Sequence, residues 1–113
     1  MIRLKRAYDP PAPEDGRRIL VDRLWPRGVK KEAAHVDLWL KEVAPSTALR
    51  QWFGHDPDRW EEFRRRYRAE LGERSALIQQ LKDEMKKGPV TLLYSAHDTE
   101  HNNAVVIKEL LES

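Results

Sequence analysis

The chain has 113 residues, no cysteine, and 21 Lys plus Arg against 19 Asp plus Glu, which leaves a formal net charge of +2. This length fits one domain, residues 1–113, with its own hydrophobic core. The lack of cysteine excludes disulfides, thiolate zinc sites and cysteine nucleophiles. No apolar run is long enough to span a membrane, and residues 1–6 lack the apolar segment of a secretory signal, so we expect a cytoplasmic protein. A net charge this small gives little long-range attraction for nucleic acid.

Hydrophobic patterning predicts an α/β domain: a short, mainly parallel sheet with helices packed on it. Residues 2–6 alternate apolar and basic side chains, as in a short strand, and the proline-rich segment 9–16 is a loop. Residues 18–24 are apolar on both faces, which predicts a central strand buried on both sides. Residues 30–34 fit one helical turn, and loose alternation over 35–43 predicts a third strand.

The middle of the chain is helical. Ser46 is a candidate N-cap for a helix that ends at Gly54. The next helix is delimited by Asp56, Pro57 and Gly72, where Gly72 suits the left-handed position after a helix. Its apolar side chains recur at helical spacing and predict one buried stripe, formed by Trp60, Phe63, Tyr67 and Leu71.

The last third of the chain predicts a helix, a strand and a helix. Ser75 opens the first of these helices. The run 90–94 has Thr91 as its only polar residue, which predicts a strand in the centre of the sheet, adjacent and parallel to strand 18–24. The final helix is expected to begin near residue 100 and to continue to about 112.

Polar side chains gather where the two predicted central strands end. Open α/β domains bind ligands at the carboxyl ends of their strands, where free N–H groups of helix N-termini favour anions. We therefore expect one composite site. Its candidate catalytic residues are His97, Asp98 and His101, and its candidate ligand-binding residues are Asp22, Arg23, Trp25, Arg27, Ser95, Asn102 and Asn103.

The catalytic hypothesis makes His97 or His101 a general base and Asp98 its orienting partner. The structural alternative is that Asp98 or Thr99 caps the last helix and that both histidines are ordinary loop residues. A helix that starts after Asp98 would not align the two imidazoles, so a two-histidine metal site has no support from this spacing.

Arginines at 23 and 27 could fork onto phosphate or carboxylate, or pair with Asp22 instead. Asn102 and Asn103 are poor helix formers at a helix start, which favours ligand contact over local hydrogen bonding.

Ser95 and Trp25 complete the candidate site. No Gly-x-Ser-x-Gly turn surrounds Ser95, so a hydrogen-bonding role is favoured over a nucleophilic one. Trp25 fits either the core or a stacking surface, and the core is favoured because large aromatic side chains mostly bury.

Three blocks, 22–28, 44–55 and 94–104, occur in the order typical of one protein family. Over essentially its whole length the chain resembles the short, YeaO-like branch of the domain-of-unknown-function 488 family. The resemblance implies a compact α/β fold of bacterial or archaeal cytosolic type and no assigned activity. Longer members of the family carry a cysteine at the end of the last strand and a Cys-His-Arg run at the helix start. These places hold Tyr94 and residues 102–104 here, so a thiol-based or arginine-anchored activity does not carry over.

The leading functional hypothesis is binding of a compact anionic ligand, phosphate- or nucleotide-like, with hydrolysis or group transfer as accompanying chemistry. The alternative is a nucleic-acid-binding module without catalysis, which would use Trp39, the basic strand 2–6 and the arginines at 64–68. Glu61, Glu62 and Glu70 are spaced to neutralise those arginines, which makes nucleic acid the less favoured partner. A third reading is a regulatory or assembly protein. The sequence names neither a cofactor nor an oligomeric state.

Overall fold

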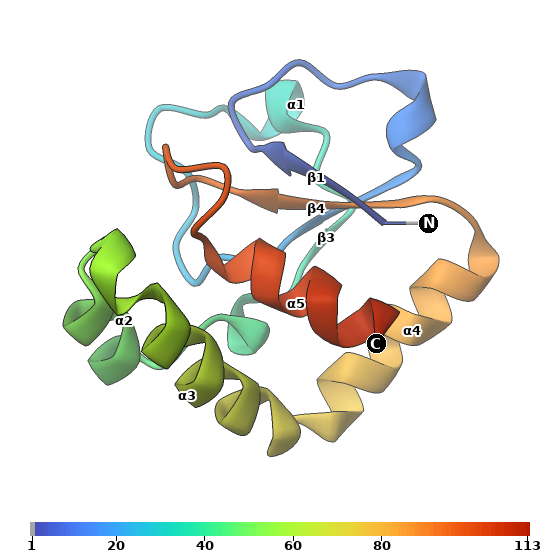
Figure 1. The fold of residues 1–113 in the computed structure, drawn as a ribbon. Helices are drawn as coiled ribbons and strands as arrows, with labels where there is room; N and C mark the ends of the chain where they lie inside the picture. The colour runs from blue at the N-terminus through green and yellow to red at the C-terminus, as the bar shows by residue number, and fades with distance from the viewer. Residues whose placement is uncertain (1) are drawn as a thin grey trace.

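The computed structural model describes residues 2–113 and contains one four-stranded sheet in the order β1-β4-β2-β3 (Figure 1). All three strand pairs are parallel. The strands are β1 Ile2–Arg6, β2 Arg17–Leu20, β3 Leu38–Trp39 and β4 Val90–Tyr94. The α/β class and the parallel sheet predicted from the sequence are confirmed.

Strand β4 lies in the interior of the sheet, and all five of its residues are buried. Leu92 is in register with Leu4 of β1 on one side and with Ile19 of β2 on the other. The prediction that segment 90–94 is central, adjacent and parallel to the strand that begins near residue 18 is therefore confirmed.

Residues 2–113 form five α-helices, of which α2 to α5 lie on one side of the sheet and α1 lies on the other (Figure 1). Their bounds are α1 Lys31–Ala34, α2 Thr47–Phe53, α3 Trp60–Gly72, α4 Ser75–Lys87 and α5 Asn103–Glu112. Ser46 caps α2 as predicted, since its side chain accepts from the Leu49 N–H, and Gly54 ends that helix in the left-handed conformation.

Alternation along the strands divides the core between the two faces of the sheet. Ile19, Val90 and Leu92 point into the large core under the helices. On the opposite face Leu20 and Leu93 pack with Trp25, Trp39 and other apolar side chains in a smaller cluster. This second cluster lies close to the carboxyl ends of β2 and β4, so it supports the loops that follow these strands.

A buried ionic cluster occupies the rest of that second face. Asp15, which is 2% exposed, pairs with Arg18 at 2.5 Å and with Lys5 at 3.0 Å. Arg18 also donates to the carbonyls of Ala34 and His35, which ties α1 to the sheet. Burial by itself raises the pKa of Asp15, but the hydrogen bonds from Lys5, the Ala12 N–H and Arg18 together hold it below its usual value.

Two predicted strands are shorter than expected. Pairing of β2 with β4 ends just after Leu20, at a hydrogen bond from the Val21 N–H to the Leu93 carbonyl. Leu24 was predicted to continue the strand, but it is 64% exposed in the following loop. The third strand covers only Leu38–Trp39, and the residues after Leu40 turn into a 3₁₀ helix.

Two helix ends also differ from the prediction. Gly72 is the last residue of α3 rather than a left-handed residue beyond it, and Glu73 follows in a right-handed conformation. A left-handed residue is unnecessary there because the N–H groups of Glu73 and Arg74 already donate to carbonyls of the last helical turn. The final helix begins at Asn103, three residues later than expected. No helix within residues 2–113 is long and apolar enough to cross a membrane.

Candidate functional site

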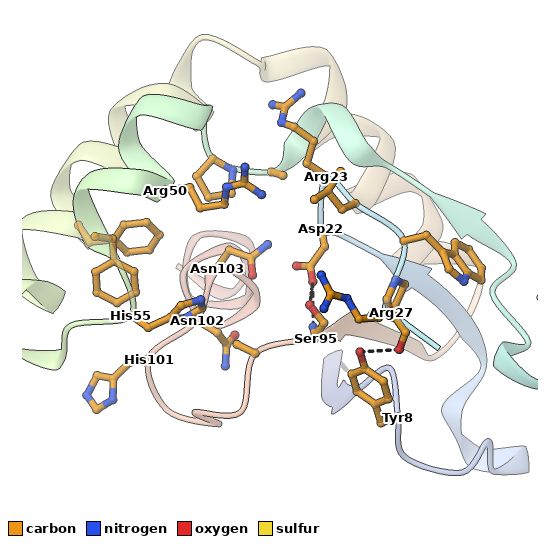
Figure 2. Close-up of a pocket in the computed structure, with 18 residues that line it drawn as sticks. Tyr8, Asp22, Arg23, Arg27, Arg50, His55, Ser95, His101, Asn102 and Asn103 are labelled. Atoms are coloured by element: carbon orange, nitrogen blue, oxygen red, sulfur yellow. Dashed lines mark hydrogen bonds between the residues drawn. The ribbon is translucent and has the colours of Figure 1, made fainter. Parts of the chain in front are cut away.

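A cleft of about 400 Å³ opens at the carboxyl ends of β2 and β4 (Figure 2). Its walls come from the loop after β2, the loop between β4 and α5, the region around α2, and single residues of α3 and of the loop after β1. Most of the candidate residues predicted from the sequence line it: Asp22, Arg23, Trp25, Arg27, Ser95, His101, Asn102 and Asn103. His97 and Asp98 do not.

Three hydrogen bonds join the loops that follow the two central strands. The backbone N–H and the hydroxyl of Ser95 both donate to Oδ2 of Asp22, at 2.8 and 2.7 Å (Figure 2). The side-chain amide of Asn103 donates to the Val21 carbonyl at 2.9 Å. These groups meet because β2 and β4 are parallel neighbours, so their carboxyl ends lie at the same edge of the sheet.

The charge of the cleft is positive. Arg23, Arg27 and Arg50 line it, and Asp22 is its only acidic side chain, so these groups sum to +2. None of the three arginines forms a salt bridge with any carboxylate in the described part of the chain. Figure 2 shows Arg27 and Arg50 directed toward the space bordered by Asp22 and Asn103, while the guanidinium of Arg23 points away from it.

Arg23 carries a second unusual feature. Its Nε is buried and has no hydrogen-bond partner among residues 2–113. A buried donor without a partner costs about 1–3 kcal/mol, so such groups are rare in folded proteins. This unsatisfied donor lies beside the cleft, in the loop after β2, and not in the space that Arg27 and Arg50 face.

The two asparagines form the start of α5. Asn102 is the N-cap: its Oδ1 accepts from the Val105 N–H at 3.1 Å and its Nδ2 donates to the Asp98 carbonyl at 2.9 Å. It is 3% exposed, so both of its polar groups are used within the protein. Asn103 is the first helical residue. Local hydrogen bonding thus accounts for Asn102 at the helix start, whereas the side chain of Asn103 bonds to the distant loop after β2.

Asp98 does not cap α5, and neither does Thr99, contrary to the structural alternative drawn from the sequence. Asp98 instead organises the turn ahead of the helix, where its Oδ1 accepts from the N–H groups of Glu100 and His101. Its Oδ2 lies 2.8 Å from Nδ1 of His101. The Glu100 N–H and the His101 ring hold the pKa of Asp98 below its usual value.

The two candidate histidines are directed to different neighbours. His101 packs edge-on against Trp60 of α3, with ring centroids 5.1 Å apart. His97 is exposed, and its Nδ1 lies 3.4 Å from a guanidinium nitrogen of Arg6. No group of three or more His, Asp or Glu side chains in residues 2–113 converges as a metal site requires.

Trp25 and Trp39 hold the loop after β2 in place. The indole N–H of Trp25 donates to the Val29 carbonyl, and that of Trp39 donates to the Asp22 carbonyl, each at 2.7 Å. The two rings pack edge to face with centroids 5.5 Å apart. Trp25 is half-buried, so it belongs to the second core cluster and also reaches the cleft.

Three lining residues with polar side chains were absent from the predicted set: Tyr8, Arg50 and His55. Tyr8 follows β1 at the same edge of the sheet, and its hydroxyl donates to the Arg27 carbonyl at 3.0 Å. His55 is left-handed, with φ of 57°, directly after left-handed Gly54. The signals for them were the parallel position of β1 and the block 44–55, which contains both Arg50 and His55.

The three consecutive arginines of α3 are paired, while Arg68 of the same helix forms no salt bridge within residues 2–113. Arg64 contacts Glu61 and Glu109 at 2.8 and 2.9 Å. Arg65 and Arg66 both contact Glu62, at 2.5 and 2.7 Å. The hydrogen bond from Arg65, supported by that from Arg66, lowers the pKa of Glu62 to about 2.

Glu70 was predicted to neutralise these arginines, but it does not pair with any of them. It accepts instead from the backbone and hydroxyl of Ser46, at 2.8 and 2.6 Å. It thereby fastens the start of α2 to α3.

Comparisons with known proteins agree with the resemblance seen in the sequence. The uncharacterised protein YeaO of Escherichia coli K12 is 48% identical over 112 residues, which cover 99% of this chain and 97% of that protein. The uncharacterised proteins Rv3073c of Mycobacterium tuberculosis H37Rv and Mb3100c of Mycobacterium bovis are each 39% identical over 110 residues, covering 97% of this chain and 92% of theirs. No solved structure matches the chain.

A family model described as "Inactive DUF488-N3 subclade" matches residues 1–113, the full length of the sequence. The relatives above match over almost the same span. The chain therefore belongs to the DUF488-N3 family, in the subclade described as inactive.

Proposed function

We propose that this protein binds a compact anionic, phosphate-like ligand in the cleft at the carboxyl ends of β2 and β4. The observation that carries the proposal is the state of Arg27 and Arg50, which face the cleft without a carboxylate partner among residues 2–113. Guanidinium groups offer forked donors that match phosphate and carboxylate oxygens. A ligand anion would supply the partner that the fold itself does not provide.

Two further features favour an anion in this place. The N-terminus of α5 borders the cleft through Asn102 and Asn103, and the partial positive charge of a helix N-terminus attracts anions. The lining of the cleft carries a net charge of +2, which equals the formal net charge of the whole 113-residue chain. The positive charge is therefore concentrated where a ligand would enter.

Binding rather than turnover is the function that we propose. His97 lies outside the cleft lining, and His101 is held between Asp98 and Trp60 at its edge. The description of the family as inactive also favours binding without catalysis. Nucleic acid is the weaker candidate, because the glutamates beside Arg64, Arg65 and Arg66 already occupy the donors that phosphates would need.

Isothermal titration calorimetry with inorganic phosphate and with pyrophosphate tests the proposal. We expect Arg27→Gln and Arg50→Gln each to weaken binding about ten-fold or more, because a hydrogen bond to a charged group contributes about 1.5–3 kcal/mol. Arg68→Gln is the matched control, since Arg68 is an exposed arginine outside the cleft lining, and it should bind as the parent does. Equal affinity in all three variants, or no binding of either anion at millimolar concentration, would contradict the proposal.

A further inference from the structure

The one carboxylate in the cleft is difficult to explain in a site for a simple anion. Oδ2 of Asp22 accepts both hydrogen bonds from Ser95. Oδ1 is not buried and accepts no hydrogen bond from residues 2–113. The carboxylate would repel a bound phosphate, and anchoring of Ser95 needs only one of its two oxygens. The second oxygen is free to accept a hydrogen bond from a ligand.

The arginines of the cleft do not neutralise Asp22 either. No guanidinium nitrogen of Arg23, Arg27 or Arg50 forms a salt bridge with it, although all four side chains line the same space. The cleft therefore keeps two kinds of unpaired group apart: forked donors and one acceptor. A ligand that satisfies both must carry an anionic group together with hydrogen-bond donors.

We infer that the ligand is a phosphorylated sugar, whose phosphate meets Arg27 and Arg50 and whose hydroxyls donate to Oδ1 of Asp22; this inference rests on the proposed anion-binding function. The net charge of +2 favours a phosphate monoester, which carries about −1.5 to −2 at neutral pH, over a zwitterion with no net charge. Carboxylates also accept from ribose hydroxyls in dinucleotide-binding α/β folds.

The size and lining of the cleft agree with such a ligand. Its volume of about 400 Å³ lies in the range of small-molecule sites, about 300–1,000 Å³, and leaves room beside a phosphate group. Leu24, Pro45 and Phe53 add apolar surface to the lining of the cleft. The sugar phosphate could be free or part of a nucleotide, and the experiment distinguishes these two sources.

The test is calorimetric titration of the parent and of Asp22→Asn with inorganic phosphate, ribose 5-phosphate and AMP. We expect the parent to bind ribose 5-phosphate at least ten-fold more tightly than phosphate. In Asp22→Asn this ratio should fall to about two-fold or less, while phosphate itself binds equally or more tightly because a negative charge is gone. The asparagine keeps an oxygen that accepts from Ser95, so the loop stays anchored. Asp83→Asn, an exposed site on α4, is the charge-matched control.

Each outcome decides one claim. Loss of phosphate and sugar phosphate affinity in equal proportion in Asp22→Asn would make Asp22 a purely structural residue and overturn the inference. Phosphate binding that depends on Arg27 and Arg50, with no preference for ribose 5-phosphate in the parent, would also overturn it and leave the proposed function standing. Failure of all three compounds to bind would remove both. AMP binding tighter than ribose 5-phosphate would assign the sugar phosphate to a nucleotide, and equal or weaker binding would assign it to the free form.

Discussion

The arginines of α3 and those of the cleft have the same chemistry but different surroundings. Arg64, Arg65 and Arg66 are consecutive, and each contacts a glutamate of its own helix or of α5. Arg27 and Arg50 are far apart in the sequence, face one cleft and form no salt bridge with residues 2–113. A dense run of arginines in a sequence is thus a poor guide to a binding surface when glutamates are interspersed. Under the proposed function, unpaired arginines that the fold assembles around one cleft are the better guide.

The buried pair of Asp15 and Arg18 extends the comparison to the interior and should give the largest effect on stability. Asp15→Ala would leave the guanidinium of Arg18 buried without its carboxylate, which typically costs about 3 kcal/mol or more. Urea denaturation of the variant and of the parent measures this loss. Asp83→Asn, at an exposed carboxylate, should change stability by less than about 0.5 kcal/mol.

The carboxylate of Asp15 also makes the stability of the folded protein depend on pH. Because the pKa of Asp15 is lower in the folded protein than in the unfolded chain, its contribution is complete above the unfolded value, about 3.9, and is lost as the pH falls through the folded value. The stability curve of Asp15→Ala should be flatter than that of the parent below about pH 4. Parallel curves in this range would show that the pair does not act as described.

For the arginines of the cleft we expect almost no effect on stability, in contrast to the large loss expected for Asp15→Ala. The double variant Arg27→Gln with Arg50→Gln breaks no salt bridge, so its free energy of unfolding should stay within about 0.5 kcal/mol of the parent. Removal of two positive charges relieves repulsion in the cleft, so any gain in stability of the double variant at low salt should shrink when added salt screens that repulsion. Thermal melts at two ionic strengths measure both effects. A loss above about 1 kcal/mol would mean that these arginines serve the fold.

The smallest effect is expected for the ion pairs of α3, where substitution should change the pKa of one carboxylate, that of Glu62. The Glu62 carboxylate should titrate near pH 2, because the hydrogen bonds from Arg65 and Arg66 favour its charged form. Side-chain carbon chemical shifts followed by NMR report the midpoint. In Arg65→Gln the midpoint should rise toward the ordinary glutamate value of about 4.3. An unchanged midpoint would mean that the pairs on α3 are not formed in solution.

The sequence was sufficient to bring the main groups of the cleft together. The apolar runs within segments 18–24 and 90–94 favoured two buried, neighbouring strands of a parallel sheet. Once they are neighbours, Asp22 and Ser95 must meet at one edge, and the structure joins them by hydrogen bonds.

Local patterns could not decide the start of the last helix. Asp98 and Asn102 are equally good capping residues by type. The choice depends on tertiary contacts: Asp98 binds the turn that holds His101 against Trp60, while Asn103 must reach the Val21 carbonyl. Neither contact is visible in the neighbouring sequence.

The position of α2 was equally inaccessible from local pattern. Its place above the cleft follows from the packing of Phe53 on Phe63 of α3, whose ring centroids lie 4.3 Å apart. That packing brings Arg50 and His55 to the lining. Helical periodicity predicted the apolar faces of both helices, but it does not specify which face meets which or at what angle.

The strand order determines when the sheet can form as the chain is synthesised on the ribosome. Strands β1 and β2 emerge early, yet both pair with β4 and not with each other. Strand β1 therefore has no partner until β4, in which Val90 pairs with Ile2, has also been synthesised. Contacts between such distant segments form slowly, because a long loop must close first. The sheet can be complete only after β4 has been synthesised, and the hydrogen bonds of Ser95 and Asn103 that join the two loops require the same late part of the chain.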